Sequence, residues 1–406
     1  MKEKLNFLEL FAGAGGLSEG FIQNGFEPVA YVEQDKDCCS TLLTRSIYHY
    51  LLKNNLKDSY NEYLKGNLDR NKLIEMCPNT LKDKIICKQI SSQTLPNLIT
   101  TIELLLNGKT LDVLIGGPPC QAYSLIGRAQ NKLKINDERL YLYKHYLEIL
   151  THFKPKVFVF ENVPGLLSMS SGDLFKTIIN DFKQIGYEVD YKILNSAEYG
   201  VLQSRKRVIV IGAFNKKVTL ELPKIDISMY RVKDIFEDLN DLMPGQSSDK
   251  YSQQPNEYLK RFNIRNDDEI LTHHEARPNN DRDLNIYKYA IQTWNNEKKR
   301  IKYHEIPDYL QSHNNKSSFL DRYKVVADDL NTSHTMVAHI SKDGHHYIHP
   351  DINQCRSISV REAARIQSFP DDYYFEGSRT SKFKQIGNAV PPLLSKAITN
   401  KIKEIL

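Results

Sequence analysis

Residues Leu111–Ser124, LDVLIGGPPCQAYS, decide how this chain is expected to fold. The apolar run Leu111–Ile115 is typical of a short buried strand, and Gly116-Gly117 ends it. Pro118-Pro119 fixes two φ angles and removes two backbone N–H donors, so the turn is stiff. Cys120 therefore follows a rigid turn at the carboxyl end of a strand, where open α/β sheets bind ligands. Free cysteines are also often buried, so this stretch alone leaves Cys120 open as a nucleophile or a core thiol.

A second strand–loop–helix pattern lies near the start of the chain. Leu5–Leu10 is a strand candidate, Phe11–Gly16 (FAGAGG) is a glycine loop, and Leu17–Asn24 has the apolar spacing of a helix. Such a loop lets the backbone approach a nucleotide-like ligand. A dinucleotide fingerprint needs Gly or Ala three residues after its second Gly, but here Gly15 leads to Ser18. The loop therefore favours an adenosine ligand without a pyrophosphate, such as S-adenosylmethionine.

Acidic residues follow two further strand candidates. Pro28–Val32 ends at Glu33, and an acid about 20 residues beyond such a loop binds ribose hydroxyls. Val157–Phe160 ends at Glu161, which a Pro-Gly stop follows closely. A solvated surface Glu33 and a structural Glu161 paired with an arginine are the simpler alternatives.

The alternation of strands and helices predicts a doubly wound, mostly parallel α/β sheet. In such a sheet the carboxyl ends of parallel strands share one edge, so Phe11, Glu33, Cys120 and Glu161 are expected to converge there. A methyl donor, a thiol and an acid at one edge suggest methylation of a pyrimidine at C5. The thiolate would add to C6 while Glu161 donates to N3, and it must later leave, which suits cysteine.

Two arginines precede the strand candidate Val208–Gly212. Arg205 and Arg207 lie at alternate positions in Gln203–Arg207 (QSRKR), so both are expected on one face of the chain. One of the two is expected to pair with a buried acid.

Composition limits the class of protein. The 406-residue chain has a net charge of +5 and 40% hydrophobic residues, which suits one large or two medium globular domains. The mild positive charge permits a polyanionic partner without requiring one. Six scattered cysteines indicate free thiols in a reducing compartment. No apolar run approaches the roughly 20 residues that span a bilayer, and no signal peptide is visible.

Two polar regions carry no obvious chemistry. Cys38 to about Lys84 is expected to be a helical insertion on the scaffold. Residues 223–355 are rich in Asn, Asp, His and Tyr and hold the only tryptophan, Trp294. Nine of the twelve histidines fall in this second region, but no cysteine accompanies them in metal-ligand register, so we expect no metal. A polar, aromatic-bearing surface module is the expectation.

Six stretches, taken in order, resemble one family. The chain is similar to the DNA (cytosine-5) methyltransferases, most of all the compact bacterial restriction–modification type. The matching stretches are Phe11–Gly16, Gly117–Ser124, Glu161–Val163, Gln203–Arg207, Arg356–Asp371 and Gln385–Pro392.

The resemblance implies roles for individual residues. Cys120 would be the nucleophile, and Glu161 would bind N3 and the exocyclic amine of the target base. Arg207 would contact the base O2, and Arg205 would lie near the phosphate and the nucleophile. The residues expected around S-adenosylmethionine are Phe11, Ala12, Gly13, Gly15, Gly16, Leu17, Glu33, Gln89, Ile90, Pro118 and Asn388.

One position departs from the family pattern. Before Ile90 the family usually has an acid that contacts the adenine amine, and this chain has Gln89. An amide oxygen still accepts a hydrogen bond, so a weaker or altered cofactor contact is expected rather than inactivity.

The resemblance also implies an organisation and partners. Residues 1–222 would form the catalytic and S-adenosylmethionine-binding domain with a Rossmann-like methyltransferase sheet. Residues 223–355 would mainly be a second, smaller, irregular target-recognition domain, and residues 356–406 would carry the C-terminal motifs and a helix returning to the catalytic domain. The expected enzyme is a monomer of the bacterial cytoplasm or nucleoid that flips a cytosine out of double-stranded DNA. Its expected role is the protective methylase of a restriction–modification system, with functional pairing to a restriction endonuclease left open.

Other function classes predict different features. A tRNA-cytosine methyltransferase would use the same chemistry, but the large recognition region favours duplex DNA. An amino-methylating enzyme would need no thiol. An NAD dehydrogenase would need a complete glycine fingerprint, which this chain lacks. A catalytically dead DNA-binding regulator would bind without turnover, although every catalytic position is filled.

Overall fold

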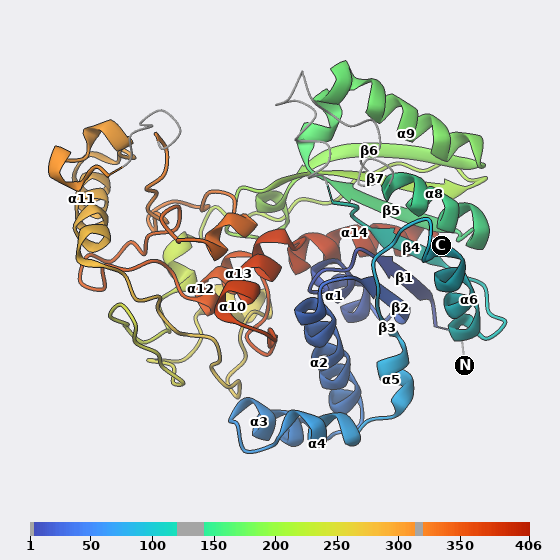
Figure 1. Cartoon of the computed structure of the whole chain (residues 1–406), viewed down its shortest axis with the longest axis horizontal. Helices are drawn as coiled ribbons and strands as arrows, with labels where there is room; N and C mark the ends of the chain where they lie inside the picture. Colours follow the sequence, from blue (N-terminus) through green and yellow to red (C-terminus); the bar gives the residue numbers. More distant parts are fainter. Residues whose placement is uncertain (1–3, 120–141, 313–319) are drawn as a thin grey trace.

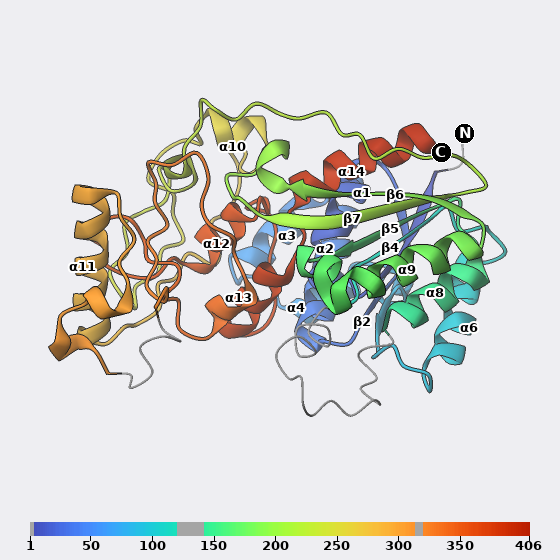
Figure 2. The same ribbon diagram turned by 90° about the horizontal axis from the view of Figure 1, so that it is seen from above.

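The computed structural model describes residues 4–119, 142–312 and 320–406. Its centre is a seven-stranded sheet in the order β3-β2-β1-β4-β5-β7-β6 (Figures 1 and 2). The strands are β1 (Asn6–Leu10), β2 (Glu27–Glu33), β3 (Ile85–Cys87), β4 (Val113–Gly116), β5 (Val157–Asn162), β6 (Tyr187–Asn195) and β7 (Lys206–Phe214). All neighbours pair in parallel except at β7, which is antiparallel to both β5 and β6. The predicted doubly wound, mostly parallel sheet is therefore confirmed.

Helices cover both faces of the sheet because its central strands are apolar on both sides. On one face Leu8, Leu114 and Phe158 pack with α6 (Leu95–Leu106), α8 (Leu142–Phe153) and α9 (Asp173–Gln184). On the other face Phe7, Ile115 and Val159 pack with α1 (Gly16–Gln23) and α14 (Pro392–Ile405). Figure 2 shows the two sets on opposite sides of the sheet. The last helix thus returns to lie beside the first one.

The region between β2 and β3 is helical as expected, but it is not wholly an addition to the scaffold. Its first helix, α2 (Lys36–Lys53), buries Leu42 in the core under α1, next to β2. A second small core, which includes Tyr48, Tyr60 and Leu73, joins α2 to the shorter helices. Those helices are α3 (Lys57–Leu64), α4 (Arg70–Glu75) and α5 (Asn79–Asp83). The expectation of one long insertion was wrong for α2, because its apolar side faces the sheet.

Residues 223–355 contribute no strand to the sheet within the described chain. They hold α10 (Glu257–Arg261), α11 (Asp281–Glu297), short 3-10 turns and isolated bridges. Trp294 is only 7% exposed, and its indole N–H donates to Asp329 at 3.0 Å. The only tryptophan therefore belongs to a local core with Tyr287 and Tyr303, not to the surface. The helices α12 (Val360–Ile366) and α13 (Arg379–Asn388) follow, and Figure 1 shows them between this region and the sheet.

A buried ionic cluster connects α12 to residues 223–355. The Arg365 guanidinium donates to Asp371 at 2.6 Å and also pairs with Asp238, and all three side chains are fully buried. Arg361 and the Tyr251 hydroxyl reach the same Asp371 carboxylate. Removing one partner of such a cluster leaves an uncompensated buried charge, which is strongly destabilising.

We expect Arg365→Met to lower the free energy of unfolding by about 3–5 kcal/mol, measured by urea denaturation at neutral pH. The control is Lys176→Met, which breaks an exposed pair with Asp173 and should cost at most about 1 kcal/mol. Equal losses in the two variants would show that the buried cluster contributes no more than a surface pair.

A buried carboxyl lies in β1, on the face covered by α1. Glu9 is 2% exposed, and one of its carboxyl oxygens has no hydrogen-bond partner among the described residues. Burial raises the pKa of Glu9 to about 8 from an ordinary value of 4.5. Between these two values the folded chain holds a proton that the unfolded chain has released. The stability contribution of Glu9 is therefore present at low pH and is lost as pH rises toward 8.

Glu9→Gln should consequently flatten the pH dependence of stability between about pH 5 and pH 8. As pH rises through this window, the free energy of unfolding of the variant should increase relative to that of the wild type. Urea denaturation at several pH values measures both curves. Parallel curves for the two proteins would contradict a titrating Glu9.

Candidate active site

Four strand ends bring the predicted residues to one edge of the sheet. Leu10 pairs with Val32 on one side and with Gly116 on the other, and Gly116 pairs with Phe160. Phe11, Glu33, Gly117 and Glu161 are thus placed at neighbouring carboxyl ends, as expected. Cys120 lies outside the described residues, but the turn leading to it, Gly117–Pro119, begins at this edge.

The glycine loop between β1 and α1 is held by Glu33. The backbone N–H of Gly13 donates to Glu33 Oε2 at 2.8 Å, and the N–H groups of Gln34 and Asp35 donate to Glu33 Oε1. The loop contains positive φ angles at Phe11 (56°), Gly13 (55°) and Gly15 (81°). A positive φ is unusual for phenylalanine, and strain of this kind persists only where the surroundings enforce it.

The glycines of this loop differ in their surroundings. A Cβ added to Gly13 would meet nothing within 4 Å, so this position faces open space. A Cβ on Gly15 would lie 2.8 Å from the Leu42 side chain, and one on Gly16 would lie 2.3 Å from the Val390 carbonyl oxygen. Gly13 therefore leaves room for a ligand, whereas Gly15 and Gly16 permit close packing within the protein.

Two other loop residues predicted at the cofactor are part of the core. Ala12 and Leu17 are buried in the cluster that joins the sheet to α1 and α14. Their side chains support the loop from the side that faces the core.

Glu161 and Arg207 form an ion pair at the sheet edge. Arg207 Nε lies 2.8 Å from Glu161 Oε1, and the two side chains are 11% and 14% exposed. The pair forms because β7 runs antiparallel to β5, which sets Val208 opposite Asn162 and Arg207 just beyond it. A Cβ on Gly117 would lie 2.5 Å from Glu161 Oε2, so a side chain there would have to displace this carboxylate. The prediction that one arginine pairs with a buried acid is confirmed.

Asn162 holds the turn that leads to Cys120. Its side-chain amide donates to the Pro118 carbonyl at 3.0 Å, and its side-chain oxygen accepts from the Val163 N–H at 2.9 Å. Pro118 is buried and Pro119 is exposed. Sequence reasoning gave Asn162 no role. The sequence feature that could have indicated a role is its position, as a polar residue that ends an apolar strand just before a Pro-Gly stop.

Arg205 is fully buried directly before β7, close enough to interact electrostatically with Arg207 and Glu161. Its guanidinium donates to the backbone carbonyls of Met336, Gly387 at 3.2 Å and Ala389 at 2.9 Å. Because it is fully buried, it lies near no exposed phosphate position in this conformation. Arg205 thus joins the start of β7 to residues 223–355 and to the segment after α13.

The remaining predicted cofactor residues occupy different environments. Ile90 is buried in the core beside β2, while Gln89 is exposed, and its backbone carbonyl accepts from the Thr94 hydroxyl at 2.6 Å. Asn388 is exposed at the end of α13. It comes just before Ala389 and Val390, which pack on Gly16, so the C-terminal segment reaches the glycine loop.

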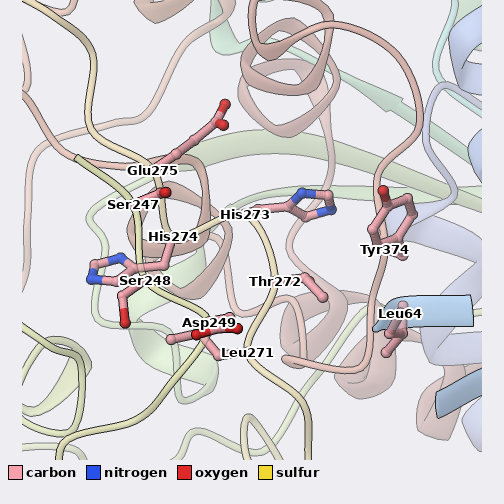
Figure 3. Close-up of a pocket in the computed structure, with 10 residues that line it drawn as sticks. All are labelled: Leu64, Ser247, Ser248, Asp249, Leu271, Thr272, His273, His274, Glu275 and Tyr374. Carbon is pink, nitrogen blue, oxygen red and sulfur yellow. The ribbon is translucent and has the colours of Figure 1, made fainter. Parts of the chain in front are cut away.

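A pocket of about 480 Å³ lies elsewhere, between Ser247–Asp249, Leu271–Glu275, Leu64 and Tyr374 (Figure 3). None of the predicted site residues lines it. Within the described chain, no three His, Cys, Asp or Glu side chains gather as metal ligands would. In those same residues no helix has the length and apolar character required to span a membrane.

Comparison with known proteins identifies relatives along the whole chain. The family model described as C-5 cytosine-specific DNA methylase matches residues 5–69 and 84–404. Type II methyltransferase M.Bpa9945I of Bacillus paralicheniformis is 40% identical, with 98% of each chain covered. Type II methyltransferase M.AgeI of Thalassovita gelatinovora is 30% identical, again over 98% of each chain. The family match includes α2 and α3, and its one internal gap, residues 70–83, holds the whole of α4 and α5.

Solved structures share the fold. An E. coli protein described as a putative DNA modification methyltransferase encoded within a prophage has a TM-score of 0.64 and 21% identity, with 99% of each chain covered. Entamoeba histolytica methyltransferase EhMeth has a TM-score of 0.57 and 16% identity over the same share of each chain. A methyltransferase requires a methyl donor, and for this family that donor is S-adenosylmethionine. From the family match and the close relatives, the chain belongs to the C-5 cytosine-specific DNA methylase family.

Proposed function

We propose that this protein is a site-specific DNA (cytosine-5) methyltransferase acting through a covalent bond between Cys120 and C6 of a flipped-out cytosine. The observation that carries the proposal is the shared sheet edge, where the glycine loop, the turn before Cys120 and the Glu161–Arg207 pair meet. The type II names of the relatives support the role of a protective methylase in a restriction–modification system.

The edge suits S-adenosylmethionine as the methyl donor. Gly13 faces open space beside a strained loop that Glu33 holds in place, so the backbone can approach a ligand there. Phe11, Glu33, Gln89, Ile90, Pro118 and Asn388 would surround the cofactor, with Ala12, Gly15, Gly16 and Leu17 shaping the loop. When bound, the sulfonium supplies an electrophilic methyl group.

The residues of this chain would activate the base. The Cys120 thiolate forms a bond to C6 while Glu161 donates a proton at N3, which makes C5 an electron-rich carbon that accepts the methyl group. Loss of the C5 proton to solvent then breaks the Cys120–C6 bond and releases the thiolate, and N3 returns its proton to Glu161. Cysteine suits both steps because a thiolate adds readily near neutral pH and also leaves readily.

The Glu161–Arg207 pair would orient the base. Arg207 holds the carboxylate through its Nε atom and donates from Nη1 to the Lys206 carbonyl at 2.8 Å, which leaves Nη2 to donate to the base O2. Asn162 fixes the backbone at Pro118, two residues before Cys120 in the sequence. The role we assign to Arg205 is to position β7 and the segment around Asn388 through the three carbonyls it binds.

Each of the three parts of the chain would have a separate role. Residues 1–222 would bind the cofactor and perform the chemistry, residues 223–355 would recognise the DNA sequence, and residues 356–406 would complete the catalytic domain. Since C5 and C6 are inaccessible within a stacked duplex, the target cytosine must be flipped out. We propose a cytoplasmic monomer that acts on double-stranded DNA and requires no metal.

DNA containing 5-fluorocytosine at the target should trap a covalent complex, because fluorine at C5 blocks the final elimination. The wild-type protein should form this adduct only in the presence of S-adenosylmethionine, and Cys120→Ser should form none. Denaturing gel electrophoresis with labelled DNA detects the complex. An adduct with the serine variant would refute Cys120 as the nucleophile.

Gly13→Ala should weaken binding of S-adenosylhomocysteine at least about tenfold, because the new methyl group enters the space left for the ligand. The matched control is Gly25→Ala, whose position also has a positive φ (84°) and nothing within 4 Å of an added Cβ. Both variants should lose about 1 kcal/mol of stability from backbone strain. Calorimetric binding and urea denaturation test this, and a Gly13→Ala variant that binds like the control would place the ligand elsewhere.

A further inference from the structure

The segment Asp371–Gly377, here called the strap, connects α12 to α13 and passes behind the glycine loop. Its third residue, Tyr373, is only 1% exposed, and its hydroxyl donates to the backbone carbonyl of Ala14. A Cβ on Gly15 would lie 2.9 Å from the same hydroxyl. The Tyr373 side chain therefore touches two consecutive residues of the loop.

This contact matters because the loop is strained. Its positive φ angle at Phe11 (56°) is unusual for a residue with a side chain and needs external support to persist, whereas Gly13 and Gly15 adopt positive φ freely. Glu33 supports the loop at Gly13, on the side of β2. The Ser18 hydroxyl, from α1, donates to the Gly15 carbonyl at 3.1 Å. Tyr373 adds a hydrogen bond to the Ala14 carbonyl from a part of the chain about 360 residues away in sequence.

The strap itself is fixed by the helices that follow β2. Arg45 donates to the Asp372 carboxylate at 2.8 Å, and the Tyr60 hydroxyl donates to the Asp372 carbonyl at 2.9 Å. The Glu376 carboxylate accepts hydrogen bonds from three residues of α2, α3 and α4, which are Thr44 at 2.6 Å, Tyr63 at 2.7 Å and Arg70 at 3.2 Å. Arg70 belongs to the stretch 70–83 that the family match leaves out.

Residues 223–355 hold the strap from another direction. The Phe375 N–H donates to His273 Nε2 at 3.0 Å, and the His273 and Tyr374 rings lie 4.4 Å apart. Figure 3 shows these two side chains next to each other at the pocket. Asp371 is held at the other end of the strap by the buried arginines of α12. The strap is therefore anchored at several points and can act as a rigid support.

We propose that Tyr373 is a positioning residue for the methyl-donor loop. Its hydroxyl fixes the Ala14 carbonyl and so orders Phe11–Gly16 before the ligand arrives. A preordered loop binds more tightly because less conformational freedom is lost on binding. This inference rests on the proposed function, since it assigns the adenosine ligand to this loop.

The test is Tyr373→Phe, which removes one oxygen atom and keeps the ring. The matched control is Tyr187→Phe, because Tyr187 is 2% exposed and its hydroxyl donates to the Pro155 carbonyl at 2.8 Å, at the far end of the sheet. Binding of S-adenosylhomocysteine is measured by calorimetry on the full chain without DNA, and the melting temperature of each variant is recorded.

We expect Tyr373→Phe to raise the Kd about fivefold, the effect of losing one hydrogen bond, and Tyr187→Phe to leave the Kd within about twofold of the wild type. Both should lower the melting temperature by similar amounts. Hydrogen exchange at the amides of Phe11–Gly16 should accelerate only in Tyr373→Phe.

Two results would overturn the inference. One is a Kd for Tyr373→Phe equal to that of the wild type, and the other is equally weakened binding of S-adenosylhomocysteine in both variants. Either result would show that Tyr373 contributes only to the overall stability of the protein. Failure of the wild type itself to bind S-adenosylhomocysteine would instead refute the proposed function, and the assignment of Tyr373 with it.

Discussion

The buried Arg365–Asp371 ion pair is the interaction on which the placement of residues 223–355 beside the sheet and its helices depends. It joins α12 to the start of the strap, and through Asp238 it reaches residues 223–355. Two charges removed from water are tolerated only when their geometry and remaining hydrogen bonds are satisfied, so the surrounding backbone and side chains must supply those partners. The position of the strap, and with it the Tyr373 contact to the glycine loop, follows from that arrangement.

The sheet supplies the second constraint. Parallel pairing of β1, β2, β4 and β5 brings four loops to one edge, and the single reversed strand, β7, delivers Arg207 to Glu161 from the opposite direction. A parallel strand in that place would carry its start to the other edge of the sheet. The antiparallel direction of β7 is thus the feature that places the Arg207 guanidinium beside the Glu161 carboxylate.

Much of this was predictable because it depends on local patterns. Short apolar runs stopped by glycine and proline indicated the strands, and the rule that parallel strands end at one edge placed Phe11, Glu33 and Glu161 together. The pairing of one arginine with a buried acid was also predicted. Asn162 and Tyr373 were not given roles, because a polar residue beside a turn and a single tyrosine have no periodicity that separates function from packing.

By itself, the sequence determined the class of fold, the ligand-binding edge and the residues whose chemistry suits methyl transfer to a pyrimidine. Only the tertiary structure decided how those residues are supported: Arg205 buried between three carbonyls, Trp294 within a local core, and α2 as part of the scaffold. The physical reason is separation along the chain. Hydrophobic periodicity and turn chemistry act over a few residues, whereas a hydrogen bond from Tyr373 to Ala14 exists only once the whole sheet, its helices and the buried ionic cluster have formed.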